Sequence, residues 1–289
     1  MYFNEDLVLD VRLNELNQYI DKFVIVESGF THSGEKKDFN FDIRKFQKFA
    51  NKIIYLKINE KPKNLIKIYE QDNYEEVKNK QVENALILEN FQRNYIYKGL
   101  ENFNDDDFIL ISDIDEIPNL SLIDLNSNKN SIVMFKQYFF HYKFNLFLDD
   151  FYFFGTKGCI KKKLISPQWL RNIKGKKYSI FRIDSYFSKK KYNNVKIIEK
   201  GGWHFTNVMD EEKIVYKIKS YLHHADFPEE LLTKEIFKNL IKEKKIMYDH
   251  SADKSQDRFK NSKPLDEFEK HLLPNYIKNN FEKFKDWLI

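Results

Sequence analysis

Two aspartates that follow an apolar run are the first candidates for chemistry in this chain. Asp113 and Asp115 lie two residues apart, directly after the apolar residues 108–111, and Pro118 is expected to stop strand pairing beyond them. Such a run is typical of a strand buried on both faces at the centre of a parallel sheet. Ligands of open α/β sheets bind at the carboxyl ends of strands, where paired carboxylates can hold a hard divalent cation and leave positions for substrate phosphates. The alternative interpretation is a solvated acidic turn, which an isolated pair of aspartates does not exclude.

Strand and helix patterns alternate in the chain before this acidic turn. Apolar residues recur at helical spacing in residues 5–20 and 75–100. Residues 23–26 and 53–58 are apolar runs typical of buried strands. This alternation predicts a doubly wound α/β domain that presents the acidic turn at the carboxyl edge of its sheet.

The second half of the chain has a different pattern, in which aromatic strands precede helices. No internal repeat and no low-complexity linker interrupts it, so we predict a single domain over residues 1–289. We expect strands at residues 131–145, 151–162 and 195–198, a short helix at 167–171, and helices at 210–224, 228–245 and 265–288, the last with a break at Pro274.

Composition and charge narrow the classes of function. The formal net charge of +5 favours anionic partners such as nucleotides but is too small to indicate nucleic-acid binding. Cys159 is the only cysteine, which excludes an intrachain disulfide. We see neither a signal-peptide pattern nor the roughly 20 apolar residues that span a bilayer, and we expect a cytoplasmic protein. Basic runs at residues 161–163 and 189–191 fit solvated surfaces, with peripheral contact to an anionic membrane face as the alternative.

Four motifs occur in a fixed order along the chain. They are residues 4–16 (NEDLVLDVRLNEL), residues 23–28 (FVIVES) with Thr31 and Gly34, residues 111–118 (ISDIDEIP) and residues 202–204 (GWH). Together they resemble glycosyltransferase family 17, which includes the N-acetylglucosaminyltransferase that adds the bisecting residue to N-glycans. The similarity continues at Lys217, residues 226–228 (DFP) and residues 273–276 (LPNY), and so covers nearly the whole chain. The family has a further strand before residue 3, where only two residues stand here, and its Golgi members carry a membrane anchor that is not visible.

The resemblance implies a fold and a reaction. The expected fold is α/β and glycosyltransferase-A-like, with a Rossmann-like nucleotide-binding sheet and additional C-terminal helices. Residues from 1 to about 130 would bind the nucleotide sugar, and the remainder to residue 289 would face the acceptor. The implied reaction moves a sugar from a nucleotide diphosphate donor, uridine diphosphate N-acetylglucosamine (UDP-GlcNAc), to a glycan hydroxyl. The implied cofactor is Mn²⁺ or Mg²⁺, which all-oxygen surroundings favour. The cytoplasmic expectation favours a glycan or glycolipid under assembly as the acceptor.

The same resemblance suggests roles for individual residues in binding the metal and the donor. Asp115 is the expected direct metal ligand, with Asp113 binding the ribose or the metal through water. His204 would complete the metal shell or contact the diphosphate; the alternative is a structural histidine, the usual role of a lone one. Glu27 and Ser28 are also expected to contact the base or ribose of the donor, and Arg93 to contact its diphosphate. Each of these three also has an ordinary structural interpretation, as a strand-end polar pair or a helix-surface ion pair.

The resemblance also implies that the transfer inverts the anomeric configuration. Such a direct displacement needs a general base, and the sequence leaves that base open. Glu116 and Asp226 are the two leading candidates, with Asp150 and Glu211 behind them.

Two other classes of protein compete with the interpretation as a glycosyltransferase. Phosphatases of the haloacid dehalogenase type also use paired aspartates, although usually on the first strand and before a threonine-bearing turn. A non-catalytic sugar- or nucleotide-binding protein would share the aromatic residues but has no need of the acidic turn.

Overall fold

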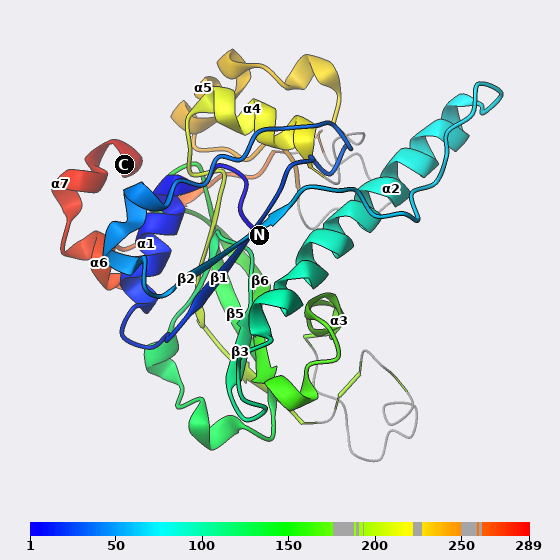
Figure 1. Cartoon of the computed structure of the whole chain (residues 1–289). Coiled ribbons are helices and arrows are strands. Elements are labelled where there is room, and N and C mark those ends of the chain that lie inside the picture. Colours follow the sequence, from blue (N-terminus) through cyan, green and yellow to red (C-terminus); the bar gives the residue numbers. More distant parts are fainter. Residues whose placement is uncertain (176–187, 189–190, 193, 222–226, 250–258, 260–261) are drawn as a thin grey trace.

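The computed structural model describes residues 1–175, 188, 191–192, 194–221, 227–249, 259 and 262–289, with the side chain of residue 150 left out. It is a mixed α/β structure with a curled multistranded sheet (Figure 1). The helices are α1 (Asp6–Leu16), α2 (Tyr74–Tyr95), α3 (Pro167–Asn172), α4 (Glu211–Ser220), α5 (Lys234–Lys242), α6 (Asn275–Lys278) and α7 (Phe281–Phe284). The strands are β1 (Phe23–Ser28), β2 (Ile53–Ile58), β3 (Phe108–Ile111), β4 (Glu116–Pro118), β5 (Ile132–His141), β6 (Leu146–Ile160), β7 (Val195–Ile198), β8 (Gly202–Thr206) and β9 (Asp266–Glu267).

The described strands form two sheets. β1 and β2 pair in parallel, with Phe23 opposite Ile53 and Ser28 opposite Ile58. The second sheet has the order β3-β6-β5-β8-β4, with β7 added to β5 and β9 added to β6. The expectation that residues 108–111 lie at the centre of a parallel sheet is wrong: β3 ends the strand order and pairs antiparallel with β6. Its alternate residues are only partly buried. The prediction failed because a short apolar run does not reveal which strand it will pair with.

The acidic turn is fixed at both ends by strands of the larger sheet. β3 precedes it, and β4 follows it at once, antiparallel to β8. The short strand β4 was not predicted, but its pairing ends at Pro118 as expected, where Pro118 stands opposite Gly202. Gly202 adopts φ +129°, and a Cβ there would lie 2.2 Å from the Ile117 carbonyl oxygen. Only glycine fits this close approach, which sets the register that places His204 opposite Glu116.

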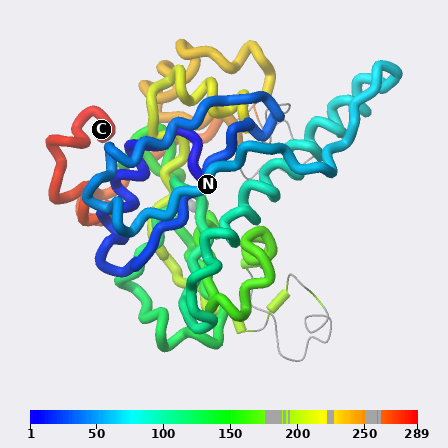
Figure 2. Tube along the Cα trace, viewed as in Figure 1, coloured from blue at the N-terminus to red at the C-terminus, as the bar shows by residue number. Residues whose placement is uncertain are grey.

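The helices that carry site residues form for local reasons. α2 begins with a capping box between Asn73 and Glu76, and it runs outward from the body of the molecule (Figure 1). α3 is short, but the Ser166 side chain accepts from the Trp169 backbone N–H and Pro167 occupies its first turn. α1 buries apolar side chains on several sides and is enclosed in the main hydrophobic core. The N-terminus lies near the middle of the trace and the C-terminus at its edge (Figure 2).

Several predicted boundaries in the second half need correction. β6 already begins at Leu146, so the expected connection at residues 146–150 is part of a strand. α5 starts behind Thr233, whose side chain caps it, rather than at Pro228. The expected long helix at residues 265–288 is instead β9, α6, α7 and single 3₁₀ turns. Its apolar residues follow helical spacing only approximately, and Leu273, Ile277 and Phe284 are buried by packing against the core. Among the described helices, none is both long and apolar enough to cross a membrane.

Candidate functional site

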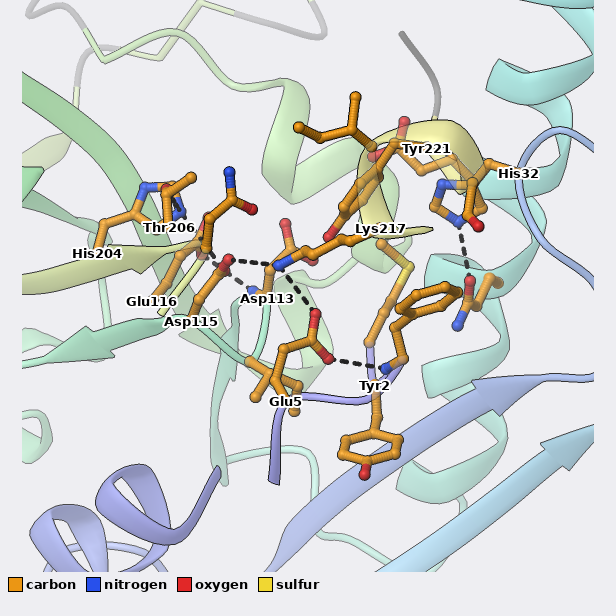
Figure 3. Close-up of a pocket in the computed structure, with 18 of the residues that line it drawn as sticks. Tyr2, Glu5, His32, Asp113, Asp115, Glu116, His204, Thr206, Lys217 and Tyr221 are labelled. Carbon is orange, nitrogen blue, oxygen red and sulfur yellow. Dashed lines mark hydrogen bonds and ion pairs between the residues drawn. The ribbon is translucent and has the colours of Figure 1, made fainter. Parts of the chain in front are cut away.

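A cavity of about 490 Å³ opens around the acidic turn. Its walls come from the N-terminal segment, the loop after β1, α2, the acidic turn, β5, β6, β8, α4 and the segment that follows α5 (Figure 3). Its lining includes the charged residues Glu5, Arg93 and Lys217 and the aromatic residues Phe139 and Phe153. A concave site with a few convergent polar groups beside apolar rings is the usual form of a small-molecule binding site.

Arg12 of α1 holds the backbone of the acidic turn. One terminal nitrogen donates to the Glu116 carbonyl oxygen and, at 3.4 Å, to that of Asp113. The other donates to the Ser112 hydroxyl at 2.7 Å. Burial lowers the pKa of Arg12 to about 10, against the opposing effect of the nearby carboxylates, and the guanidinium remains charged at neutral pH. From the sequence, Arg12 was only one residue of the motif at residues 4–16, without a role of its own.

Arg171 of α3 also holds the acidic turn, through hydrogen bonds to side-chain carboxylates. Its two terminal nitrogens donate to the two carboxylate oxygens of Glu116 at 2.6 and 2.7 Å, and one also lies 3.2 Å from an Asp113 oxygen. Glu116 is 1% exposed and also accepts from the Asp113 backbone N–H at 3.0 Å. Burial alone lowers the pKa of Arg171, but Glu116 and Asp113 outweigh it and raise the pKa well above its usual value. Glu116 is thus engaged in a buried fork, the geometry expected of a positioning group.

Asp113 is balanced by a second arginine. Arg93 of α2 lies 3.3 Å from both carboxylate oxygens of Asp113, 2.8 Å from Glu89 and 2.5 Å from the Gln168 side-chain oxygen. Burial raises the pKa of Asp113, but Arg93 and then Arg171 outweigh that effect and hold the pKa well below its usual range. The structure therefore brings together Arg93 and Asp113, two residues predicted to contact the donor.

Asp115 has looser partners than Asp113. One of its oxygens lies 3.4 Å from Lys217 Nζ and the other 3.5 Å from His204 Nε2 (Figure 3). Lys217 is 2% exposed and also pairs with Glu5 at 3.0 Å. Burial raises the pKa of Asp115, yet Lys217 and then His204 lower it further than burial raises it. Asp115 is thus ionised at neutral pH, and its contacts are longer than good hydrogen bonds.

The carboxylates of the acidic turn fit a divalent metal ion that takes only a few of its ligands from the protein. Across the described part of the chain, no group of three or more His, Cys, Asp or Glu side chains is arranged to hold a metal ion. Asp113 and Asp115 would supply carboxylate oxygens, and phosphate oxygens and water would fill the other positions, as Mg²⁺ prefers. His204 Nδ1 is buried and has no hydrogen-bond partner among the described residues, while Nε2 faces Asp115. Whether His204 is a ligand stays a prediction.

Two predicted donor contacts lie outside the cavity wall. Glu27 is fully buried and its carboxylate accepts from Lys37, Tyr55 and two backbone N–H groups at 2.7–3.1 Å. The Ser28 hydroxyl accepts from the Phe30 backbone N–H at 3.1 Å. These contacts order the loop that follows β1. Glu27 and Ser28 do not line the cavity themselves and act on it only by holding that loop in place.

Of the three other candidate bases, only Glu211 has a side chain that the structure describes. Asp226 lies outside the described residues, and the side chain of Asp150 is not described either. Glu211 lies in the first turn of α4 and does not line the cavity. Phe227, which directly follows Asp226 in the sequence, does line it.

The first basic run has local partners. Lys161 donates to the Phe103 carbonyl oxygen, Lys162 pairs with Asp106 at 2.6 Å, and Lys163 donates to the Asn130 carbonyl oxygen. These contacts fit the interpretation of a solvated surface. In the second run, residues 189–190 lie outside the described part of the chain.

Comparison with known proteins gives one match. It assigns residues 1–289, the whole chain, to the family described as glycosyltransferase family 17. Neither the curated proteins nor the solved structures contain a significant match. The family match confirms the resemblance carried by the acidic turn, the GWH motif and the other motifs. The protein belongs to glycosyltransferase family 17.

Proposed function

We propose that this glycosyltransferase moves N-acetylglucosamine from its uridine diphosphate conjugate to a glycan hydroxyl, with inversion and with a divalent metal. The observation that carries the proposal is the cavity itself, in which Asp113 and Asp115 follow β3 and face an aromatic wall. A glycosyltransferase-A-like arrangement of the sheet is part of the proposal. Membership of the family supports the transfer of a sugar, and the geometry supports the place where it occurs.

Charge balance supports the metal. Arg93, Arg171 and Lys217 are each paired with carboxylates of the protein, so they have little charge to spare for a diphosphate. A divalent ion would supply the charge that stabilises the leaving diphosphate as the sugar–phosphate bond breaks. The protein's own part is to hold Asp113 and Asp115 ionised and in fixed positions.

The aromatic wall supports the binding of the sugars. Phe139 and Phe153 flank the His204 ring at centroid distances of 4.9 and 4.5 Å. Together with Phe227 and Tyr248 they give the cavity an apolar side next to Asp115. Such a surface packs against the apolar faces of sugar rings and excludes water from the reacting bond. We therefore place the transferred sugar and the acceptor on this side.

Asp226 is our proposed general base. Glu116 has both carboxylate oxygens bonded to Arg171, which opposes its taking a proton from an acceptor hydroxyl. Asp226 adjoins a residue of the cavity wall in the sequence, and Glu211 does not reach the wall. The variant Asp226→Asn should keep nucleotide binding and lose transfer. Loss of nucleotide binding in this variant would instead indicate a role in the donor site.

The proposal is tested by calorimetry and by a transfer assay. UDP should bind to the protein in Mn²⁺ and bind far more weakly in chelator, and the intact donor should release UDP slowly by hydrolysis. Equal UDP affinity in both conditions would rule out the metal. Release of inorganic phosphate from phosphate monoesters, with no UDP release, would indicate a phosphatase. Binding without turnover in the presence of extracts of lipid-linked and N-linked glycans would indicate a non-catalytic protein.

A further inference from the structure

His32 has a fixed backbone position that the proposed chemistry does not explain. It lies in the turn after β1, where Gly34 has φ +92° and its N–H donates to the Thr31 carbonyl oxygen at 3.0 Å. The His32 backbone N–H donates to the Ser220 carbonyl oxygen at the end of α4, also at 3.0 Å. These two contacts hold the residue between the loop and α4. Its ring lines the cavity, and in the view of Figure 3 it lies on the opposite side of Lys217 from His204.

Gln92 of α2 sets the proton position on the His32 ring. Its side-chain oxygen lies 3.0 Å from His32 Nε2, and its side-chain nitrogen donates to the Val26 carbonyl oxygen at 3.4 Å. Because the amide nitrogen is directed at a carbonyl, the amide oxygen is the atom that faces the ring. An amide oxygen only accepts, so His32 Nε2 must carry a hydrogen. Burial lowers the pKa of His32, which favours the neutral ring.

The other ring nitrogen is consequently a bare acceptor. In a neutral imidazole with hydrogen on Nε2, Nδ1 offers only a lone pair. No described residue donates a hydrogen bond to His32 Nδ1, and this atom is not among the buried polar atoms sealed from solvent. A ligand N–H or O–H that enters the cavity would therefore find an oriented acceptor.

The location of His32 suits the base end of a nucleotide. Gln92 is adjacent in α2 to Arg93, which contacts Asp113 at the acidic turn. The rings of Phe30 and Tyr221 also line this side of the cavity, and aromatic rings are the common stacking surface for nucleobases. With the diphosphate at the acidic turn, the base would extend toward α2 and the loop after β1. That direction leaves the Phe139 side for the sugars.

We propose that His32 reads the donor nucleobase by accepting a hydrogen bond from a ring N–H, and so selects uracil over cytosine. This inference rests on the proposed function, because it assumes a nucleoside diphosphate with its phosphates at the acidic turn. Uracil presents an N–H at ring position 3, whereas cytosine presents a lone pair there, which would face the lone pair of Nδ1. Gln92 is the positioning residue, since it fixes which nitrogen accepts.

Calorimetry with Mn²⁺ and four probes tests the proposal: UDP, CDP, N3-methyl-UDP and pyrophosphate. Wild-type protein should bind UDP about tenfold more tightly than CDP or N3-methyl-UDP, the effect of one well-made hydrogen bond to a group otherwise left unpaired. His32→Ala should lose most of this preference and keep its pyrophosphate affinity. Gln92→Met should reduce the preference in the same direction, because the ring is then free to place its hydrogen on Nδ1. His271→Ala, at an exposed histidine whose side chain pairs with Glu269 away from the cavity, is the matched control.

The outcomes separate the two proposals. If wild-type protein binds neither the nucleotides nor pyrophosphate, the proposed function and this inference both fall. If UDP binds but CDP and N3-methyl-UDP bind equally well, the proposed function stands and the reading by His32 is wrong. Equal weakening of UDP and CDP by His32→Ala, with pyrophosphate unchanged, would also overturn it and indicate contact with the ribose. The wild-type comparison of UDP with N3-methyl-UDP needs no variant, so a folding defect in His32→Ala cannot hide the answer.

Discussion

The two aspartates of the acidic turn are held by different chemistry. Asp113 lies 3.2–3.3 Å from guanidinium groups of α2 and α3, whereas Asp115 faces Lys217 and His204 at 3.4 and 3.5 Å. A guanidinium presents a planar fork of donors that fixes a carboxylate, while an ammonium is a compact point charge. The comparison indicates that Asp113 is part of a rigid frame and that Asp115 retains lone pairs for a ligand. Residues of the same type, two positions apart, thus have different tasks.

The largest expected effect comes from removing the charge of Asp115. Asp115→Asn should reduce sugar transfer about a thousandfold, because the proposed direct metal ligand and several kcal/mol of charge stabilisation would be lost. Asp113→Asn should reduce transfer less, since Asp113 is paired with Arg93 and Arg171. Transfer rates and Mn²⁺ affinity measured for both variants check the order, with Asp38→Asn on the exposed loop as the control. A larger loss for Asp113 would reverse the assignment of the metal ligand.

The second expected effect is on stability. Arg171→Met should lower the free energy of unfolding by about 3–5 kcal/mol, because it leaves the buried Glu116 carboxylate without its partner. The double variant Arg171→Met with Glu116→Gln should regain part of that loss, since the buried charge is then absent. Denaturant unfolding measures both, with Arg44→Met at the exposed Arg44–Asp42 pair as the control. If the single variant is as stable as wild type, the fork does not hold the turn.

The acid limb of the stability curve should report how strongly the arginines stabilise the Asp113 carboxylate. The pKa of Asp113 is depressed in the folded protein, so its contribution is present above the unfolded pKa near 4 and is lost as pH falls below that value. The side chain is 28% exposed, and solvent screening limits the contribution to about 2 kcal/mol. Asp113→Asn should therefore flatten the decline in stability below pH 4 and leave the slope between pH 5 and 8 unchanged. An unchanged acid limb would show that the arginines do not stabilise this carboxylate.

The sequence predicted the parts of the site whose signals are local. The apolar run before Asp113 marks the end of β3, and the structure brings Asp115 close to His204 of the GWH motif. The motif resemblance was likewise sufficient for the family. These signals lie within a few residues of the atoms that they position.

The contacts that Arg12 and Arg171 make with the acidic turn could not be predicted in the same way. Arg171 lies far along the chain from Glu116 in a six-residue helix, and Arg12 resembles any polar-face arginine of α1. Their roles depend on tertiary contacts that leave no periodic pattern in the sequence. For the same reason the antiparallel partner of β3 was missed, because an apolar run specifies burial but not pairing. Lys217 was noticed only as a matching position, and its burial between Glu5 and Asp115 could not be inferred from the sequence.

The smallest expected effect concerns His204, and it sharpens the comparison between the two aspartates. Nε2 lies 3.5 Å from Asp115 and 3.3 Å from the Thr206 hydroxyl, a position suited to orienting the carboxylate. Outer partners of metal ligands typically change metal affinity by about 10- to 100-fold when they are removed. His204→Ala should therefore weaken Mn²⁺ binding about tenfold, measured by calorimetry with UDP present, and leave Asp115 able to bind the metal. Restoration by His204→Gln, which keeps a donor but is a poor metal ligand, would support the orienting role. If His204→Ala matches the loss caused by Asp115→Asn, His204 is a metal ligand itself, as the sequence first suggested.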